Sequence, residues 1–145
     1  MNEIILFMIS SIVLWPFAFY LHELGHKWSA NKQGVEAHIE FWFHSGIPSM
    51  RCVPHGALAN REAFLLSGGL LSGVILLCLS YLVIYEWWIF TPLFTLGLIN
   101  IVYGFYEMVF KDKMSIENYM KYHYVIYVLI GLIGLIFSHY IAISY

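Results

Sequence analysis

The sequence predicts an all-α membrane protein with four transmembrane helices and a small cytoplasmic β-hairpin between the first helix and the second. Three observations carry this prediction. Hydrophobic residues fill 61% of the 145 positions and charged residues only 11%, whereas a soluble domain has roughly 45–50% and about 25%. Asp, Glu, Lys and Arg are absent from four long stretches, and the basic residues gather between them. This composition disfavours a soluble globule, a disordered chain and a nucleic-acid-binding protein.

Each uncharged stretch is close to the ~20 apolar residues that a helix needs to cross a ~30 Å hydrocarbon core. The stretches are 18, 23, 20 and 22 residues long and occupy positions 4–21, 63–85, 87–106 and 124–145. We therefore expect one integral-membrane domain over residues 1–145, embedded in the lipid bilayer. Its helices should cover about residues 4–26, 63–85, 87–110 and 123–143.

The basic residues indicate how these helices are oriented. All seven Lys and Arg lie in two segments, Lys27–Arg61 and Lys111–Lys121, and each segment joins two of the expected helices. Four spans put both segments on the same side, and the positive-inside rule assigns that side to the cytoplasm. We expect a multi-pass protein of the cell membrane, with basic loops 27–61 and 111–122 in the cytoplasm and both termini outside.

The first basic segment has the pattern of a β-hairpin. Hydrophobic residues occupy every second position over residues 35–43, a period that is typical of a half-buried strand. Gly34 and the Gly46–Pro48 stretch are turn signals on either side of it. A second short strand near residues 50–53 would complete the hairpin on the cytoplasmic face.

The end of the first expected helix carries the most specific motif, H-E-x-x-H, formed by His22, Glu23 and His26. Two histidines four residues apart share one face of a helix, where both imidazoles can bind one zinc ion. The intervening glutamate can reach a zinc-bound water as general base. The alternative is a pair of interfacial histidines at a helix end, but titratable residues at membrane depth are costly without a function.

A catalytic zinc usually has three protein ligands and leaves one position for water. The third ligand must lie at the same depth in the membrane as the two histidines. Glu107 meets this condition, because it is the only acidic residue of the third expected helix and lies near its cytoplasmic end. Asp112 is the runner-up, and His55 and His123 are further alternatives. Glu107 could instead only pair with Lys111, one helical turn further on.

Three segments resemble one known family. Residues 21–30 read LHELGHKWSA, similar to that family's helix-borne HELGH and the small residues after it. Residues 61–73 read REAFLLSGGLLSG, similar to its glutamate and apolar approach to a glycine-rich helix start. Asn100 precedes Glu107 by seven positions, as an Asn precedes a zinc-binding Asp in its third core helix. The family is the site-2 proteases, zinc metalloproteases that cut within the membrane. The resemblance covers about residues 15–110, so we expect a compact member that consists of the catalytic core alone.

The resemblance implies an intramembrane zinc metalloprotease that holds one Zn²⁺ per chain through His22, His26 and Glu107. Glu23 would act as the general base on a zinc-activated water. Asn100 would bind the substrate backbone, although a contact with a neighbouring helix is equally compatible with its position. Family members usually carry the third ligand in an Asp-Gly pair, which this sequence lacks.

The expected substrate is a membrane protein, cut in a transmembrane or juxtamembrane peptide. A helix hides its carbonyl groups, so the peptide must be extended before attack, and the 35–43 strand could hold it by edge pairing. Two other functions stay open: a catalytically inactive zinc-binding adaptor that binds membrane proteins without cleaving them, and a membrane zinc enzyme that hydrolyses something other than peptides. An intact third ligand favours an enzyme over the adaptor, and a free strand edge beside the metal favours a peptide substrate.

Overall fold

The computed structural model describes residues 2–44 and 47–144 of the chain. Side chains are described for all of these residues except 42–44, 47–49, 116, 117, 120, 123, 127, 138, 139 and 141–144. The elements follow in the order α1 (Glu3–Lys32), β1 (Ala37–His44), β2 (Ile47–Pro54), α2 (Arg61–Leu82), α3 (Trp87–Phe110) and α4 (Ile116–Ser144). Helices are thus present in all four regions where the sequence predicts them.

Local signals explain where the helices begin and end. α1 continues to Lys32, beyond the expected end near residue 26. It ends there because Gly34, two residues further on, has a φ of 74°, in the left-handed region that terminates helices. α2 begins at residue 61 because the Asn60 side chain caps it, accepting a hydrogen bond of 2.8 Å from the Ala63 N–H. α4 begins at Ile116 rather than near residue 123.

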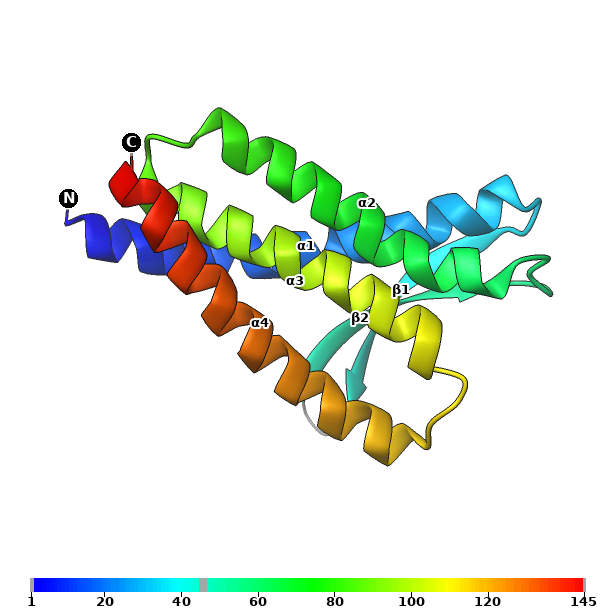
Figure 1. Cartoon of the computed structure of the whole chain (residues 1–145). Coiled ribbons are helices and arrows are strands. Elements are labelled where there is room, and N and C mark those ends of the chain that lie inside the picture. Colours follow the sequence, from blue (N-terminus) through cyan, green and yellow to red (C-terminus); the bar gives the residue numbers. More distant parts are fainter. Residues whose placement is uncertain (1, 45–46, 145) are drawn as a thin grey trace.

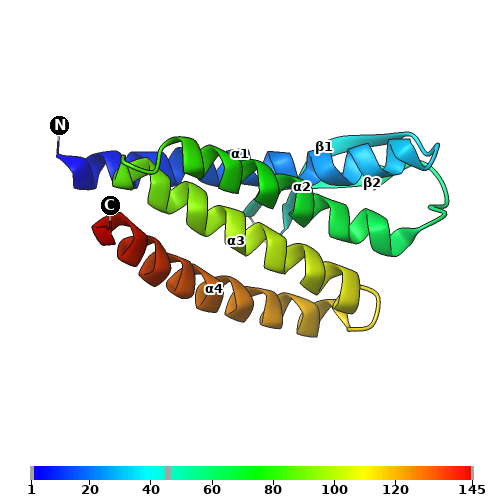
Figure 2. The same cartoon turned by 45° about the horizontal axis from the view of Figure 1, so that its top comes forward.

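α3 is the central helix of the bundle and packs against α1, α2 and α4. α4 lies along α3 and, among the described elements, contacts only that helix (Figures 1 and 2). The two labelled chain ends lie at one end of the bundle, and the links from α1 to α2 and from α3 to α4 lie at or toward the other (Figure 1). The membrane side of the two basic segments stays a prediction.

The three helices that surround the candidate site approach one another closely because small residues line their contacts. A Cβ atom on Gly25 of α1 would lie 2.8 Å from the Cα of Gly68 in α2, and one on Gly104 of α3 would lie 2.9 Å from the Cα of Gly69. Only glycine allows backbones to meet at these distances. Farther along the bundle, a cluster of buried apolar side chains joins the same helices: Ala18, Leu21, Leu76, Leu93 and Leu96.

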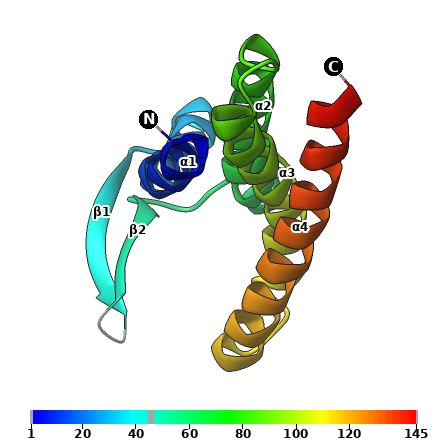
Figure 3. The ribbon, with the colours of Figure 1, turned by 90° about the vertical axis from the view of Figure 1, so that its left-hand side faces the viewer.

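The two strands form an antiparallel hairpin beside α1 (Figure 3), which confirms the predicted hairpin. Ala37 pairs with Pro54, and the register continues to His44, which pairs with Ile47. The buried Ala37 side chain anchors the hairpin in a second apolar cluster, which also contains Ala30, Phe64 and Leu65. The hairpin is therefore packed onto the helices at the same end as the candidate site.

The outer surface of the bundle is apolar, as expected for a protein in a bilayer. Ile12 of α1 and Ile136 of α4 are both 71% exposed, although large apolar patches rarely face water in soluble monomers. Within the described residues, α1, α2 and α3 are long and apolar enough to cross a membrane. α4 contains a shorter apolar segment, Tyr124–Phe137. Three of the four expected spans are thus supported by length and composition.

Candidate metal centre

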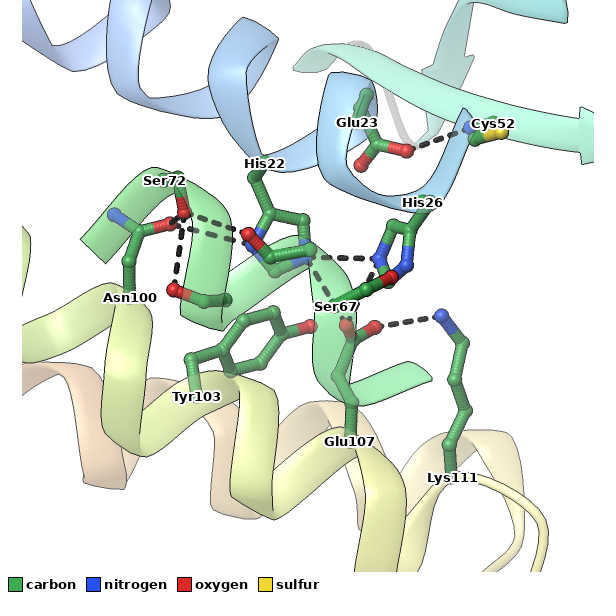
Figure 4. A network of polar contacts seen from close by, with 12 residues as sticks. His22, Glu23, His26, Cys52, Ser67, Ser72, Asn100, Tyr103, Glu107 and Lys111 are labelled. Atoms are coloured by element: carbon green, nitrogen blue, oxygen red, sulfur yellow. Dashed lines mark hydrogen bonds and ion pairs between the residues drawn. The ribbon is translucent and has the colours of Figure 1, made fainter. Parts of the chain in front are cut away.

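Two histidines of α1 and one glutamate of α3 meet inside the helix bundle (Figure 4). His22 and His26 lie one turn apart on the buried face of α1, and their Nε2 atoms are 3.1 Å apart. Glu107 Oε2 is 3.0 Å from His22 Nε2 and 3.2 Å from His26 Nε2. Each of the three residues is only 3–4% exposed. The structure therefore brings together the three residues that the sequence predicts as metal ligands.

The partners of the two Nδ1 atoms determine where each imidazole carries its hydrogen. His26 Nδ1 is 2.7 Å from the carbonyl oxygen of Phe64, which can only accept, so Nδ1 is the donor. His22 Nδ1 is 3.2 Å from Asn100 Oδ1. The amide nitrogen of Asn100 donates to the Leu96 carbonyl at 2.9 Å, which fixes the amide oxygen toward His22. Both neutral imidazoles therefore present a lone pair on Nε2.

Three acceptors consequently face one another: two imidazole lone pairs and the Oε2 atom of Glu107. With neutral imidazoles no hydrogen lies between them, so their close approach is repulsive unless they share a cation. Their separations of 3.0, 3.1 and 3.2 Å are close to roughly 3.3 Å, the edge of a tetrahedron whose ligands lie about 2.0–2.1 Å from a zinc ion. The buried residues could hold a metal ion, and their donor atoms suit zinc and other ions that accept nitrogen and oxygen ligands.

The backbone of α2 closes one side of this triangle at Gly68. A Cβ atom on Gly68 would lie 2.5 Å from His26 Nε2 and 2.9 Å from His22 Nε2. A methyl group there would fill the space in front of both nitrogen atoms. The absence of a side chain at Gly68 is therefore part of what leaves room for an ion.

Glu23 lies beside the two histidines but is bound differently from Glu107. Its carboxylate belongs with His22 and His26 to a buried group whose ligand atoms all lie within 4.8 Å of one another. Glu23 Oε2 also accepts a hydrogen bond of 2.6 Å from the backbone N–H of Cys52 in β2 (Figure 4). The carboxylate thus stands between the histidines and the hairpin, within reach of a water bound near the histidines.

The Cys52 thiol does not add a ligand to this group. Burial of the thiol, together with the negative charge of Glu23, raises the pKa of Cys52 to about 11. Among the described residues, the close group of possible ligand atoms contains His22, Glu23 and His26 but not the Cys52 thiol.

The second oxygen of Glu107 is held by groups outside the triangle. Lys111 Nζ donates to Glu107 Oε1 at 2.6 Å, and the Tyr119 hydroxyl lies 3.4 Å from the same oxygen. The expected helical pair with Lys111 is present, but it uses a different oxygen from the one that faces the histidines. The two roles considered for Glu107 are therefore compatible with each other.

Asn100 contacts the Nδ1 side of the His22 ring, opposite the Nε2 atom that faces Glu107. This position differs from the contact with substrate that the family resemblance implies. Its side chain is buried, with 4% of the residue exposed. Its oxygen contacts His22 and the Ser72 hydroxyl, which is 2.9 Å away, and its nitrogen contacts Leu96. The structure thus favours the helix-contact alternative for Asn100, and its contact with substrate stays a prediction.

The other candidates for the third ligand are not brought to the histidines. Asp112 forms an ion pair with Arg61, and the Asp112 side chain is 47% exposed. His55 Nε2 is 2.7 Å from His38 Nδ1, on the exposed part of the hairpin. The side chain of His123 lies outside the described residues. Among the described candidates, Glu107 is the residue that reaches both histidines.

Sequence reasoning missed several groups that build the site. The Phe64 carbonyl and the Cys52 N–H are backbone groups, so residue type gives no signal for them. Ser72 and Gly68 fall in the run of small residues that begins α2, and that run predicts close helix packing rather than a role beside a ligand. The only sequence signal for their place beside the site is that Gly68 and Ser72, four residues apart, share one face of the α2 helix.

Comparison with protein families, with curated proteins and with solved structures finds no match to this chain.

Proposed function

We propose that the chain is an intramembrane zinc metalloprotease of the site-2 type, which hydrolyses peptide bonds of membrane-embedded substrates. The observation that carries the proposal is the buried convergence of the His22, His26 and Glu107 acceptor atoms, with the Glu23 carboxylate beside them. The H-E-x-x-H motif and the resemblance of residues 15–110 to that family point to the same reaction. Zinc analysis and peptide cleavage, with the variants described in the Discussion, test the proposal.

In this proposal His22 and His26 would hold the zinc through Nε2, and Glu107 would hold it through Oε2. Zinc, when bound, would supply a Lewis acid that makes water more acidic. Glu23 would take a proton from the water whose oxygen bonds to the peptide carbonyl carbon, and would deliver that proton to the amine as the C–N bond breaks. The Cys52 N–H holds the Glu23 carboxylate in place while the proton moves.

The charges of the site also favour a bound cation. Glu23 and Glu107 are both buried, at 9% and 3% exposure, and Lys111 is the one cationic side chain in contact with either of them among the described residues. A buried charge without a partner costs several kcal/mol. Lys111 offsets one of the two negative charges, and a cation between the histidines would offset the one that remains.

The hairpin supports a peptide as substrate, through a different strand from the one that the sequence predicts. The sequence assigns edge pairing to the 35–43 segment, which corresponds to β1. In the structure, however, β2 is the strand that contacts Glu23. The N–H of Cys52 points away from β1 to Glu23, and alternation in an antiparallel ladder directs the N–H of Met50 outward as well. An extended peptide could therefore add to the outer edge of β2 next to the general base.

Replacing Met50 with proline tests this edge. Met50→Pro removes an outward N–H without removing a bond to β1, so it should raise the KM for a single-span peptide by roughly 2–10-fold, the value of about one hydrogen bond. Zinc content should not change. Met50→Leu is the matched control, because it alters the side chain and keeps the N–H. An unchanged KM in Met50→Pro would exclude pairing at this edge.

We also propose that α4 crosses the membrane, which places both basic segments in the cytoplasm and both termini outside. In a protein with Cys52 and Cys78 replaced by serine, Lys113→Cys should react with an impermeant maleimide only from the cytoplasmic side. Asn2→Cys and Ser144→Cys, which lie before α1 and at the end of α4, should each react only from outside. Labelling of Lys113→Cys and Ser144→Cys from the same side would mean that α4 does not cross the membrane.

Gly68→Ala should prevent metal binding. The new methyl group would lie against both Nε2 atoms, so we expect zinc per chain to fall to a small fraction of the wild-type value. Gly131→Ala is the matched control, because a Cβ there meets its nearest neighbour, Ile99, at an ordinary 3.8 Å. Equal zinc content in Gly68→Ala and the wild type would show that the ion binds elsewhere.

A further inference from the structure

We propose that Asn100 is a positioning residue, which holds His22 in the tautomer that leaves Nε2 free to bind a metal ion. The inference rests on the proposed metal centre and adds a residue to it. It starts from a buried hydrogen bond between the Asn100 amide nitrogen and the Leu96 carbonyl. The contacts then continue from Asn100 to His22 and from His22 to Glu107 (Figure 4).

The orientation of the Asn100 amide follows from its neighbours. If the amide were turned over, its oxygen would face the Leu96 carbonyl oxygen at 2.9 Å, and two acceptors would be in contact. The Ser72 hydroxyl lies 2.9 Å from Asn100 Oδ1 and 2.8 Å from the Gly68 carbonyl oxygen. It has one hydrogen for these two acceptors, so the orientation of the amide rests on the Leu96 carbonyl. Asn100 therefore offers an oxygen to His22, and His22 Nδ1 must carry the hydrogen.

The other side of the His22 ring explains why this matters. Glu107 Oε2 lies 3.0 Å from His22 Nε2, so the carboxylate would accept a hydrogen bond from an Nε2–H group. That contact favours the tautomer that puts a hydrogen where the metal would bind. The bond to Asn100 favours the opposite tautomer, and both Asn100 and Glu107 are buried, at 4% and 3% exposure.

This role differs from contact with substrate in what it affects. A group that binds the substrate backbone changes KM and leaves metal affinity unchanged. A group that fixes a ligand tautomer changes metal affinity, because partners of metal-bound histidines contribute roughly 10–100-fold to affinity.

The test compares the wild type with Asn100→Leu and Asn100→Asp, in detergent and with selectively ¹⁵N-labelled histidine. In metal-free wild type, two-bond ¹H–¹⁵N spectra should show the Nδ1–H form for the His22 signal, which is assigned by its loss in His22→Ala. In Asn100→Leu the signal should shift toward the Nε2–H form. Asn100→Asp keeps an acceptor oxygen and should keep the Nδ1–H form.

Zinc affinity, measured by competition with a chelator, gives the second readout. Asn100→Leu should bind Zn²⁺ roughly 10–100-fold more weakly than the wild type, and Asn118→Leu, an exposed control on α4, should bind it equally well. Asn100→Ala removes the same oxygen without adding bulk, and it replaces Asn100→Leu if that variant does not fold.

The outcomes separate the inference from the proposal beneath it. No zinc binding by the wild type would overturn the metal centre and the inference together. Zinc binding within twofold of wild type in Asn100→Leu or Asn100→Ala, with the Nδ1–H form retained, would overturn the role of Asn100 and leave the metal centre standing.

Discussion

Detergent-purified protein is expected to carry about one zinc ion per chain, and His26→Ala and Glu107→Ala are each expected to lose it. His26 supplies one of two imidazole nitrogens at the candidate centre, and Glu107 supplies its negative oxygen, 3.0 and 3.2 Å from the two Nε2 atoms. Removing either leaves only two protein ligands, fewer than the three that a catalytic zinc usually has. Elemental analysis of dialysed protein, expressed per chain, measures the effect.

Two control variants make this result specific. Asp112→Ala removes the other acidic candidate, and His55→Ala removes a histidine that contacts His38 instead of the centre. Both should retain zinc at the wild-type level. Zinc retained in Glu107→Ala and lost in Asp112→Ala would transfer the third ligand to Asp112. No metal in the wild type would remove the enzyme proposal altogether.

Glu23→Gln is expected to retain zinc and to lose peptide cleavage by at least about 10²-fold, the usual size of a general-base contribution. Glutamine has nearly the same shape, and its amide oxygen can still accept the hydrogen bond from Cys52 that Glu23 accepts at 2.6 Å. The variant therefore removes the base with little change to its surroundings. Cleavage is measured on a panel of single-span peptides in liposomes, with fragments identified by mass spectrometry.

Glu62→Gln, an exposed glutamate in the first turn of α2, is the matched control and should cleave at the wild-type rate. Turnover that persists in Glu23→Gln would remove Glu23 as the base. Wild-type protein that binds zinc and peptides, and cleaves none of the panel, would favour the adaptor function over the protease.

Much of the fold and the core of the candidate site could be predicted because their signals are local. Uncharged stretches of 18–23 residues predict helices wherever they occur, and a period of two predicts the strand that became β1. His22 and His26 share a face by helical geometry alone. Glu107 could be selected because few acidic residues lie at the expected depth in the membrane.

The tertiary structure decided what depends on contacts between segments far apart in the chain. It placed Asn100 against His22, 78 positions away, and gave Glu23 a partner in β2 rather than β1. It also placed Asp112 on Arg61 and the α2 backbone at Gly68 in front of both histidines. The sequence determined which helices form and which residues can bind a metal, because both follow from periodicity and residue type. Packing decided which ligand atoms face one another, because glycines set how closely the three helices approach. It also decided which backbone groups hold His26 and Glu23, and residue type gives no signal for these because every residue has them.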